Sequence, residues 1–354
     1  MSKISVTICL LFLCFPAHAG NSCVVLQYHH FGDAAPAITS VTLAQFDAHL
    51  QYLEDHHFTV MPLRGVVAAL RNRTALPEHC VSITVDDAYL SVYRNAYPRL
   101  KQRGWPLTVF VNTQGVDQEI PAYMSWEQMR EMSKHGVTFE NHGHGHIHMI
   151  RRLQGESEQQ WSARISEDIR TAQQRITQET GVAPQLFAHP YGEYTPATLG
   201  IIEQMGLVGF GQQSGPVWPG ANFGALPRFP MAAQYADMSG FKIKANTLPL
   251  PVIHADPVDP LTPAQQGKPL LTVTLKPGSH ARNSLQCFIS GSNDVELHWS
   301  VRQPDQFTVT PNFELKPGRH RTNCTMAARQ PGRFHWYSHN HFVRKADGGW
   351  YPEY

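Results

Sequence analysis

Ser82-Ile83-Thr84-Val85-Asp86-Asp87 is the stretch that decides the fold, because a run of β-favouring residues ends there in two adjacent carboxylates. Such carboxylates lose much of their hydration at a buried strand end, so they need a cation or a shared proton. Further along the chain, Glu140-Asn141-His142-Gly143-His144-Gly145-His146 supplies a cluster of neutral nitrogen ligands. One aspartate and two histidines leave a divalent metal with open positions for water and substrate, as hydrolytic zinc sites require.

Segments typical of strands and of helices alternate from Val24 to about Met231. Strands are expected at Val24–Tyr28, Val81–Val85, Leu107–Val111, Val137–Glu140, Leu186–Ala188 and Leu207–Phe210. Helices are expected at Leu43–His56, Leu63–Arg71, Tyr93–Gln102, Trp126–Lys134, Trp161–Thr180 and Pro196–Met205, where apolar residues recur at helical spacing. This alternation predicts parallel strands joined by crossover helices, in a barrel or a doubly wound sheet. The polar residues that could carry chemistry follow strand ends, where such folds place their sites.

The sequence changes character after about Leu248. A cluster of prolines predicts a stiff connector over residues 249–268. Alternating runs follow at Leu271–Leu275, Gln286–Ile289, Glu296–Val301, Phe307–Val309 and Phe334–Tyr337, separated by Pro-Gly turns. They predict a small antiparallel β-sandwich over residues 269–354. Aromatic residues near the C-terminus could stack on sugar rings, although core packing is the commoner role of such residues.

The N-terminal residues 1–19 match a secretory signal peptide. Lys3 precedes a short apolar core from Ile4 to Phe15, and Ala17-His18-Ala19 is a small-residue cleavage site. The apolar core is too short to span a bilayer. We therefore expect a secreted or periplasmic protein after cleavage near Ala19.

Four cysteines follow the expected signal peptide, and an even number in an oxidising compartment favours disulfides. Cys23 and Cys80 each precede a predicted strand. If these two strands lie side by side in parallel, their starts are close, so we expect a Cys23–Cys80 bond. Cys287 and Cys324 lie in the C-terminal part and are expected to pair with each other.

Charge and composition limit the class of partner. The 354 residues suggest two domains, and 42% of them are hydrophobic, enough for ordinary globular cores. With 29 basic and 28 acidic residues the formal net charge is only +1, and no basic block is present. This balance argues against nucleic acid or an anionic membrane as the main partner and suits a neutral glycan better. The sequence predicts no oligomeric state.

Three motifs in order resemble those of the NodB-homology polysaccharide deacetylases, carbohydrate esterase family 4. They are Thr84-Val85-Asp86-Asp87, the pair His142 and His146, and His189-Pro190-Tyr191-Gly192; Tyr28-His29 and Pro227-Arg228 add support. The resemblance is strongest to the branch that acts on poly-N-acetylglucosamine, and it covers roughly residues 24 to 235. It implies a distorted (β/α) barrel domain over residues 20–248. It also implies metal-dependent removal of acetyl groups, most commonly with Zn²⁺.

Roles follow from the chemistry of amide hydrolysis together with this resemblance. An amide carbonyl is a poor electrophile, so a metal is needed to polarise it and to lower the pKa of water. The expected metal ligands are Asp87, His142 and His146. Asp86 points away from Asp87, because adjacent side chains at a strand end diverge, and it is expected to act as the general base. The backbone N–H of Tyr191 is expected to help hold the oxyanion.

The third motif departs from the family in one position. Many members have an arginine where this chain has Ala188, and in the family that arginine steadies the catalytic aspartate. We expect Arg228 to take this role from another strand. No residue clearly matches the family's general acid; the candidates are His29, His30, His189 and His254, with His29 first because it follows a strand end. The substrate is expected to contact His30, His189, Pro190 and Tyr191.

Three functions compete on these observations. The preferred one is metal-dependent N-deacetylation of an N-acetylglucosamine polysaccharide. An O-acetyl polysaccharide esterase would use the same centre with an easier leaving group. A weakly active glycan-binding or assembly protein is the third, because the arginine is missing and the general acid has no clear match.

Overall fold

The computed structural model describes residues 19–32, 36–263, 267–278 and 281–352. The expected signal segment, residues 1–18, lies outside the described residues. No helix within the described ranges combines the length and the apolar character needed to cross a membrane.

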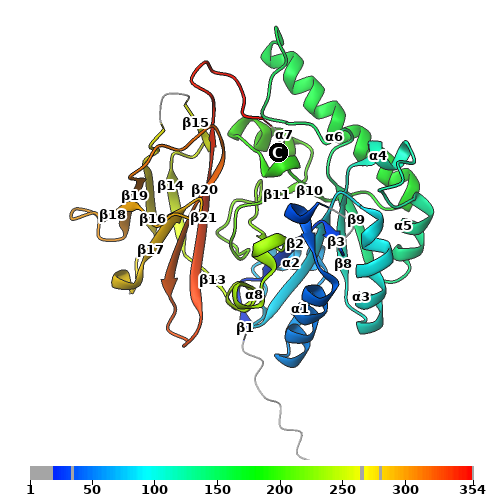
Figure 1. Ribbon diagram of the computed structural model, residues 1–354, viewed down its shortest axis with the longest axis horizontal. Helices are drawn as coiled ribbons and strands as arrows, with labels where there is room; N and C mark the ends of the chain where they lie inside the picture. Colours follow the sequence, from blue (N-terminus) through cyan, green and yellow to red (C-terminus); the bar gives the residue numbers. More distant parts are fainter. Residues whose placement is uncertain (1–18, 33–35, 264–266, 279–280, 353–354) are drawn as a thin grey trace, which may run out of the picture.

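A curled parallel sheet forms the first part of the chain (Figure 1). Its strands lie in the order β11 (Val208–Phe210), β10 (Leu186–Ala188), β9 (Val137–Asn141), β8 (Leu107–Val111), β7 (Cys80–Asp86), β2 (Val24–Tyr28) and β12 (Phe229–Pro230), with β5 (Thr59–Val60) beside β7. Every residue of β7 is buried, as is typical of a parallel strand covered on both faces. The sheet is the distorted β/α barrel expected from the sequence. Its carboxyl edge receives Asp86 at the end of β7 and Asn141 at the end of β9.

Helices cover the outside of this sheet (Figure 1). They are α1 (Leu43–Asp55), α2 (Leu63–Asn72), α3 (Tyr97–Arg103), α4 (Thr113–Asp117), α5 (Trp126–Ser133), α6 (Glu158–Thr180), α7 (Pro196–Gln204) and α8 (Met238–Ala245). The expected helix at Tyr93–Gln102 instead forms a π-helical turn, Val92–Ala96, followed by α3. Pro98 lies in the first turn of α3, where its missing N–H costs nothing, so the regular helix starts at this point.

Two antiparallel sheets form the C-terminal part. One has the order β13 (Leu248–Pro249), β21 (Phe334–Val343), β20 (Gly318–Ala327) and β17 (Gln286–Ile289), with β15 (Leu261–Thr262) also beside β21. The other has the order β14 (Val252–Asp256), β16 (Leu271–Leu275), β19 (Gln306–Pro311) and β18 (Val295–Trp299). Burial alternates along β16 and β19, and their inward residues join Cys287, Cys324 and Met326 in one core. This is the predicted β-sandwich.

The proline-rich segment differs from its prediction. Residues 249–268 are not a plain connector, because β14 and β15 lie within them. Both strands lie at sheet edges, where a proline deprives no neighbouring strand of a hydrogen bond. Strand β20 was not predicted, since its first half, Arg319-His320-Arg321-Thr322-Asn323, carries little apolar signal.

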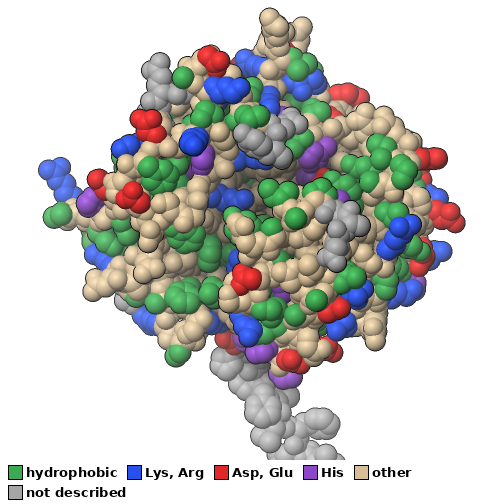
Figure 2. Space-filling model, viewed as in Figure 1, with side chains coloured by type: hydrophobic (Ala, Val, Ile, Leu, Met, Phe, Trp, Pro, Cys, Tyr) green, Lys and Arg blue, Asp and Glu red, His purple; other side chains and the backbone are tan. Residues whose placement is uncertain are grey.

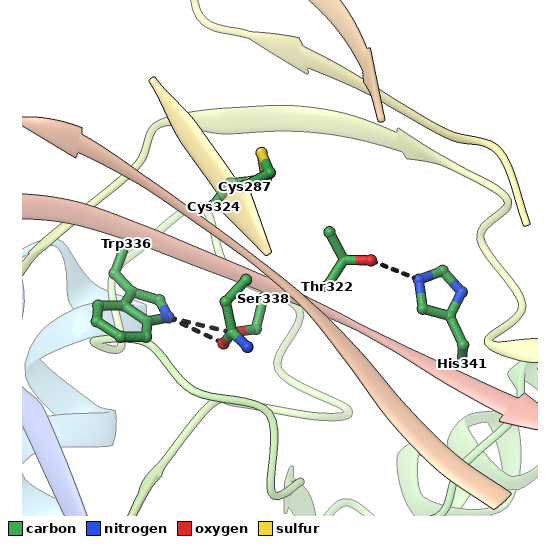
Figure 3. The surroundings of a disulfide bond; sticks show 7 residues. Cys287, Thr322, Cys324, Trp336, Ser338 and His341 are labelled. Carbon is green, nitrogen blue, oxygen red and sulfur yellow. Dashed lines mark hydrogen bonds between the residues drawn. A yellow bond between two sulfur atoms is a disulfide. The ribbon is translucent and has the colours of Figure 1, made fainter. Parts of the chain in front are cut away.

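Each part of the chain carries one disulfide. Cys23 and Cys80 are bonded at the starts of β2 and β7, whose register pairs Val24 with Val81. Cys287 and Cys324 face each other across β17 and β20 (Figure 3). In the same sheet the Trp336 indole N–H donates to Ser338 Oγ at 3.2 Å, as Figure 3 also shows. The Trp336 ring packs edge-on against Phe229 of the barrel, which ties the two parts together.

We expect the Cys23→Ala/Cys80→Ala variant to be less stable than the natural protein by about 2–4 kcal/mol, because the bond closes a long loop. The sequence separation of the two cysteines is 57. Urea unfolding measures this difference, and peptide mapping without reductant should recover the Cys23–Cys80 link. An unchanged unfolding midpoint would contradict the expectation.

Candidate active site

The two adjacent carboxylates separate at the end of β7. Asp86 is the last residue of the strand, whereas Asp87 has a left-handed backbone with φ of 73°. The Asp87 N–H donates to the carbonyl of Phe110 at 3.0 Å, which fixes this turn against β8. As a result the two side chains point to different partners.

Asp87 faces two histidines. Its Oδ1 atom lies 3.5 Å from His142 Nε2 and 3.4 Å from His146 Nε2. One potential ligand atom from each of the three residues lies within 4.8 Å of the others. His142 Nδ1 donates to the Ala188 carbonyl at 2.8 Å, which leaves Nε2 as the lone-pair nitrogen toward Asp87. These three residues are the predicted metal ligands, and the structure brings them together.

The chemistry of this set fits a cation. Asp87 Oδ1 is buried and has no hydrogen-bond partner among the described residues. Burial lowers the pKa of His142 to about 3 and that of His146 to about 4, so both rings are neutral, as metal ligands must be. Burial also raises the pKa of Asp87 to about 6, and the Tyr89 hydroxyl opposes this shift through a hydrogen bond. One carboxylate and two imidazoles form a donor set that suits zinc.

The other two histidines of the run point elsewhere. His144 Nδ1 lies 2.8 Å from the Thr113 hydroxyl, and His148 Nδ1 lies 2.7 Å from Glu193 Oε2. The loop departs from an extended strand because Asp168 accepts hydrogen bonds from the backbone N–H groups of His144 and Gly145. The four histidines His142, His144, His146 and His148 therefore do not share one face of an extended strand.

Asp86 is held by Arg228. The guanidinium binds both carboxylate oxygens, with Nη1 at 2.6 Å from Oδ1 and Nη2 at 2.8 Å from Oδ2. Gln27 Nε2 adds a third hydrogen bond at 2.6 Å. Burial alone would raise the pKa of Asp86, but the Arg228 charge outweighs it and holds this pKa well below its usual value. Arg228 therefore binds the predicted catalytic aspartate from a strand other than the one that carries Ala188.

The candidate general acids are placed very differently. His29 Nε2 lies 3.9 Å from Asp86 Oδ2, and the His29 side chain is 18% exposed. His30 stacks on Tyr89 with ring centroids 3.7 Å apart, beside the candidate metal ligands. His254 lies exposed on β14 and lines a different cavity, between the sandwich and residues 213–227. Of these three, His29 is the one that faces Asp86.

His189 and Pro190 do not fit the predicted role in substrate contact. Both are buried, and His189 Nε2 is bonded to the Gly224 carbonyl at 2.8 Å. They form the short turn that presents Tyr191, which has φ of 59° and is half-buried. The sequence identified this motif but not which way its side chains point.

Several residues of the site were missed by the sequence analysis. Tyr89 bonds Asp87, and Glu193 holds His148. Tyr89 could have been found from the sequence, because it lies only two residues after Asp87. Glu193 had no such signal, because its partners come from distant segments.

Comparison with known proteins agrees with this geometry. The model of the family described as "Polysaccharide deacetylase" matches residues 73–210. Residues 73–210 are therefore similar to this family, and the parallel-sheet part that contains them is termed the deacetylase region. The deacetylase region has 26% identity over 227 residues with a poly-β-1,6-N-acetyl-D-glucosamine N-deacetylase of Staphylococcus aureus, covering 59% of this chain and 78% of that protein. It has 28% identity over 182 residues with YxkH of Bacillus subtilis, named as a candidate polysaccharide deacetylase; the match covers 51% of this chain and only 61% of YxkH.

Solved structures show the same fold for the deacetylase region. The deacetylase PplD of Streptococcus pyogenes superimposes with a TM-score of 0.55 at 23% identity, covering 60% of this chain and 93% of that one. IcaB from Ammonifex degensii gives a TM-score of 0.55 at 24% identity, covering 63% of this chain and 97% of that one. Both support the curled parallel sheet.

We expect His142→Ala to lose bound Zn²⁺ and His144→Ala to keep it. His142 faces Asp87, whereas His144 is bonded to Thr113. The two variants are matched, since each removes one imidazole from the same loop. Elemental analysis after dialysis against a defined zinc buffer measures the difference. Equal zinc content in both variants would contradict the ligand assignment.

We expect Arg228→Met to lower the free energy of unfolding by about 3–5 kcal/mol, because it leaves the Asp86 carboxylate buried and unpaired. Arg99→Met is the control: Arg99 also binds an aspartate, Asp47, but that pair is largely exposed. Its loss should cost less than about 1 kcal/mol. Urea unfolding of both variants tests this. A similar loss in the free energy of unfolding for the two variants would contradict the expectation that the buried pair contributes more.

Proposed function

We propose that the protein is a zinc-dependent N-deacetylase of an N-acetylglucosamine polysaccharide, acting outside the cytoplasm, with its catalytic domain over residues 20–248. The observation that carries this proposal is the meeting of Asp87, His142 and His146 beside an Asp86–Arg228 pair in a deacetylase domain. Location outside the cytoplasm rests on the N-terminal sequence and on the two disulfides.

The roles of the residues follow from their positions. A divalent cation held by Asp87, His142 and His146 would polarise the acetamido carbonyl and lower the pKa of the attacking water. Asp86 accepts the proton of this water as its oxygen bonds to the carbonyl carbon. Each carboxylate oxygen has more than one lone pair, so the Arg228 contact leaves Asp86 acceptor capacity.

The remaining steps need a donor for the oxyanion and an acid for the amine. We assign the developing oxyanion to the N–H of Tyr191, which lies in a left-handed turn. When the C–N bond breaks, the leaving nitrogen takes a proton from His29, which yields acetate and a free amine. His29 is assigned this step because its Nε2 lies 3.9 Å from Asp86 Oδ2.

A neutral sugar polymer fits the surroundings of the site. The cavity beside Asp87 and His146 is lined by Tyr89, Tyr123 and the amide side chain of Asn112. Aromatic faces and neutral amides suit sugar rings and their hydroxyl groups. Figure 2 shows charges of both signs scattered over the displayed face rather than gathered in one patch. The similarity to the Staphylococcus aureus enzyme favours a β-1,6-linked substrate.

The binding-protein alternative rested on an arginine missing at position 188 and on a general acid without a clear match. Arg228 binds Asp86, which weakens the first of these two grounds. The esterase alternative uses the same centre and is separated by experiment.

Acetate release from β-1,6-linked N-acetylglucosamine oligomers tests the proposal. We expect release that stops with chelator and returns with Zn²⁺. Asp86→Asn should keep its zinc but lose turnover by about 10²–10⁴-fold, the usual contribution of a general base. Release from O-acetylated xylan but not from acetamido substrates would identify an esterase instead. Binding of the oligomers without any acetate would refute the enzyme assignment.

A further inference from the structure

A buried carboxylate connects the candidate active site to the C-terminal sandwich. Glu193 directly follows the Pro190-Tyr191-Gly192 turn and has no exposed surface. It accepts hydrogen bonds from His148 Nδ1 at 2.7 Å and from the Tyr351 hydroxyl. The Arg319 guanidinium lies 3.6 Å from Glu193 Oε1. Arg151 of the loop after His146 lies 3.8 Å from the same oxygen. Tyr351 and Arg319 both belong to the C-terminal part, so this part supplies one of the two cations and one hydrogen bond that compensate a buried charge next to the catalytic motif.

The ring of Tyr191 is held by the same residues. It stacks on His148 with centroids 3.8 Å apart, and it touches the ring of His146 at 4.5 Å. The Arg319 guanidinium lies over the Tyr191 ring at 5.3 Å, a cation–π contact. A left-handed backbone at a non-glycine residue is unfavourable and persists only where its surroundings fix it. Arg319 and His148 are part of what fixes Tyr191.

The loop after His146 also rests on the C-terminal part. No helix or strand is present between β9 and α6, over residues 142–157. Ile150 of this loop packs in one buried cluster with Phe342 and Tyr351. The Arg151 guanidinium lies over the Tyr351 ring at 5.0 Å. Strand β21, which leads to these residues, lies on the barrel side of the sandwich (Figure 1).

We infer that the C-terminal β-sandwich completes the deacetylase site, with Arg319 and Tyr351 as positioning residues for Tyr191 and His146. Arg319 acts on Tyr191 directly and through Glu193. Tyr351 acts on the histidine loop through Glu193 and Ile150. The sandwich is then a working part of the catalytic centre. The inference deepens the proposed function and rests on it.

The test uses the full chain with Arg319→Gln, Arg319→Lys and Tyr351→Phe. We expect Arg319→Gln to lower kcat at least tenfold with little change in KM, because the oxyanion donor is misplaced. Arg319→Lys should recover part of kcat, since it keeps the charge over the ring. Tyr351→Phe should weaken zinc binding several-fold, because it loosens the loop that carries His146. The visible spectrum of the Co²⁺-substituted protein should change in Arg319→Gln and Tyr351→Phe.

Arg333→Gln is the matched control. Arg333 also ties the sandwich to the barrel, through the Asn246 carbonyl at 2.9 Å and Glu78 at 3.4 Å. Neither partner belongs to the Tyr191 turn or to the loop after His146. Its loss should reduce stability and leave kcat and the Co²⁺ spectrum unchanged. Equal effects of Arg333→Gln and Arg319→Gln would overturn specific positioning.

Hydrogen exchange separates this inference from the proposed function. Arg319→Gln and Tyr351→Phe should speed exchange of residues 142–157, whatever reaction the protein catalyses, and Arg333→Gln should not. A natural protein that releases no acetate refutes the proposed function. Folded Arg319→Gln and Tyr351→Phe variants with natural exchange in this loop, natural kcat and a natural Co²⁺ spectrum overturn the inference.

Discussion

Two neighbouring carboxylates buried at the end of one strand cannot both be tolerated without separate compensation. Neighbouring carboxylates raise each other's pKa by charge repulsion, and burial raises it further. The left-handed turn at Asp87 solves the problem by sending the two side chains in different directions. Asp86 receives the Arg228 guanidinium, whereas Asp87 faces two neutral imidazoles, a donor set that suits a cation. The rest of the site is arranged around this separation.

The sheet order explains how these partners arrive. Strand β7 lies in the middle of the sheet, with β2 on one side and β8 on the other. Arg228 directly precedes β12, on the far side of β2, and its side chain reaches Asp86; β9 brings His142 from beyond β8. The carboxyl ends of the parallel strands β7 and β9 lie at one edge, so residues far apart in the sequence meet there.

The fold was largely predictable because its signals are local. Apolar runs and helical spacing gave most strands and helices to within a few residues, and the parallel arrangement followed from their alternation. The predictions failed where a local signal had a second meaning. Prolines at 249–268 suggested a connector, although an edge strand tolerates them equally well. His189 matched a motif, but a motif does not show that the side chain points into the core.

The site was predictable only in part, for a related reason. Residue type and spacing identified Asp86, Asp87, His142 and His146, because the chemistry requires those groups near one another. Glu193 and Arg319 could not be found in this way, since their importance lies in contacts between distant segments.

A buried charge needs a partner at the right place in the fold, whichever part of the sequence supplies that partner. The carboxylate of Asp86 needs a guanidinium at hydrogen-bond distance, but nothing requires the guanidinium to come from the strand that carries Ala188. Arg228 comes from the start of a different strand, β12, and binds both carboxylate oxygens, at 2.6 and 2.8 Å. A motif that lacks one residue is therefore weak grounds for assuming lost activity. The chemistry depends on a positive charge beside Asp86, and in this protein Arg228 supplies that charge.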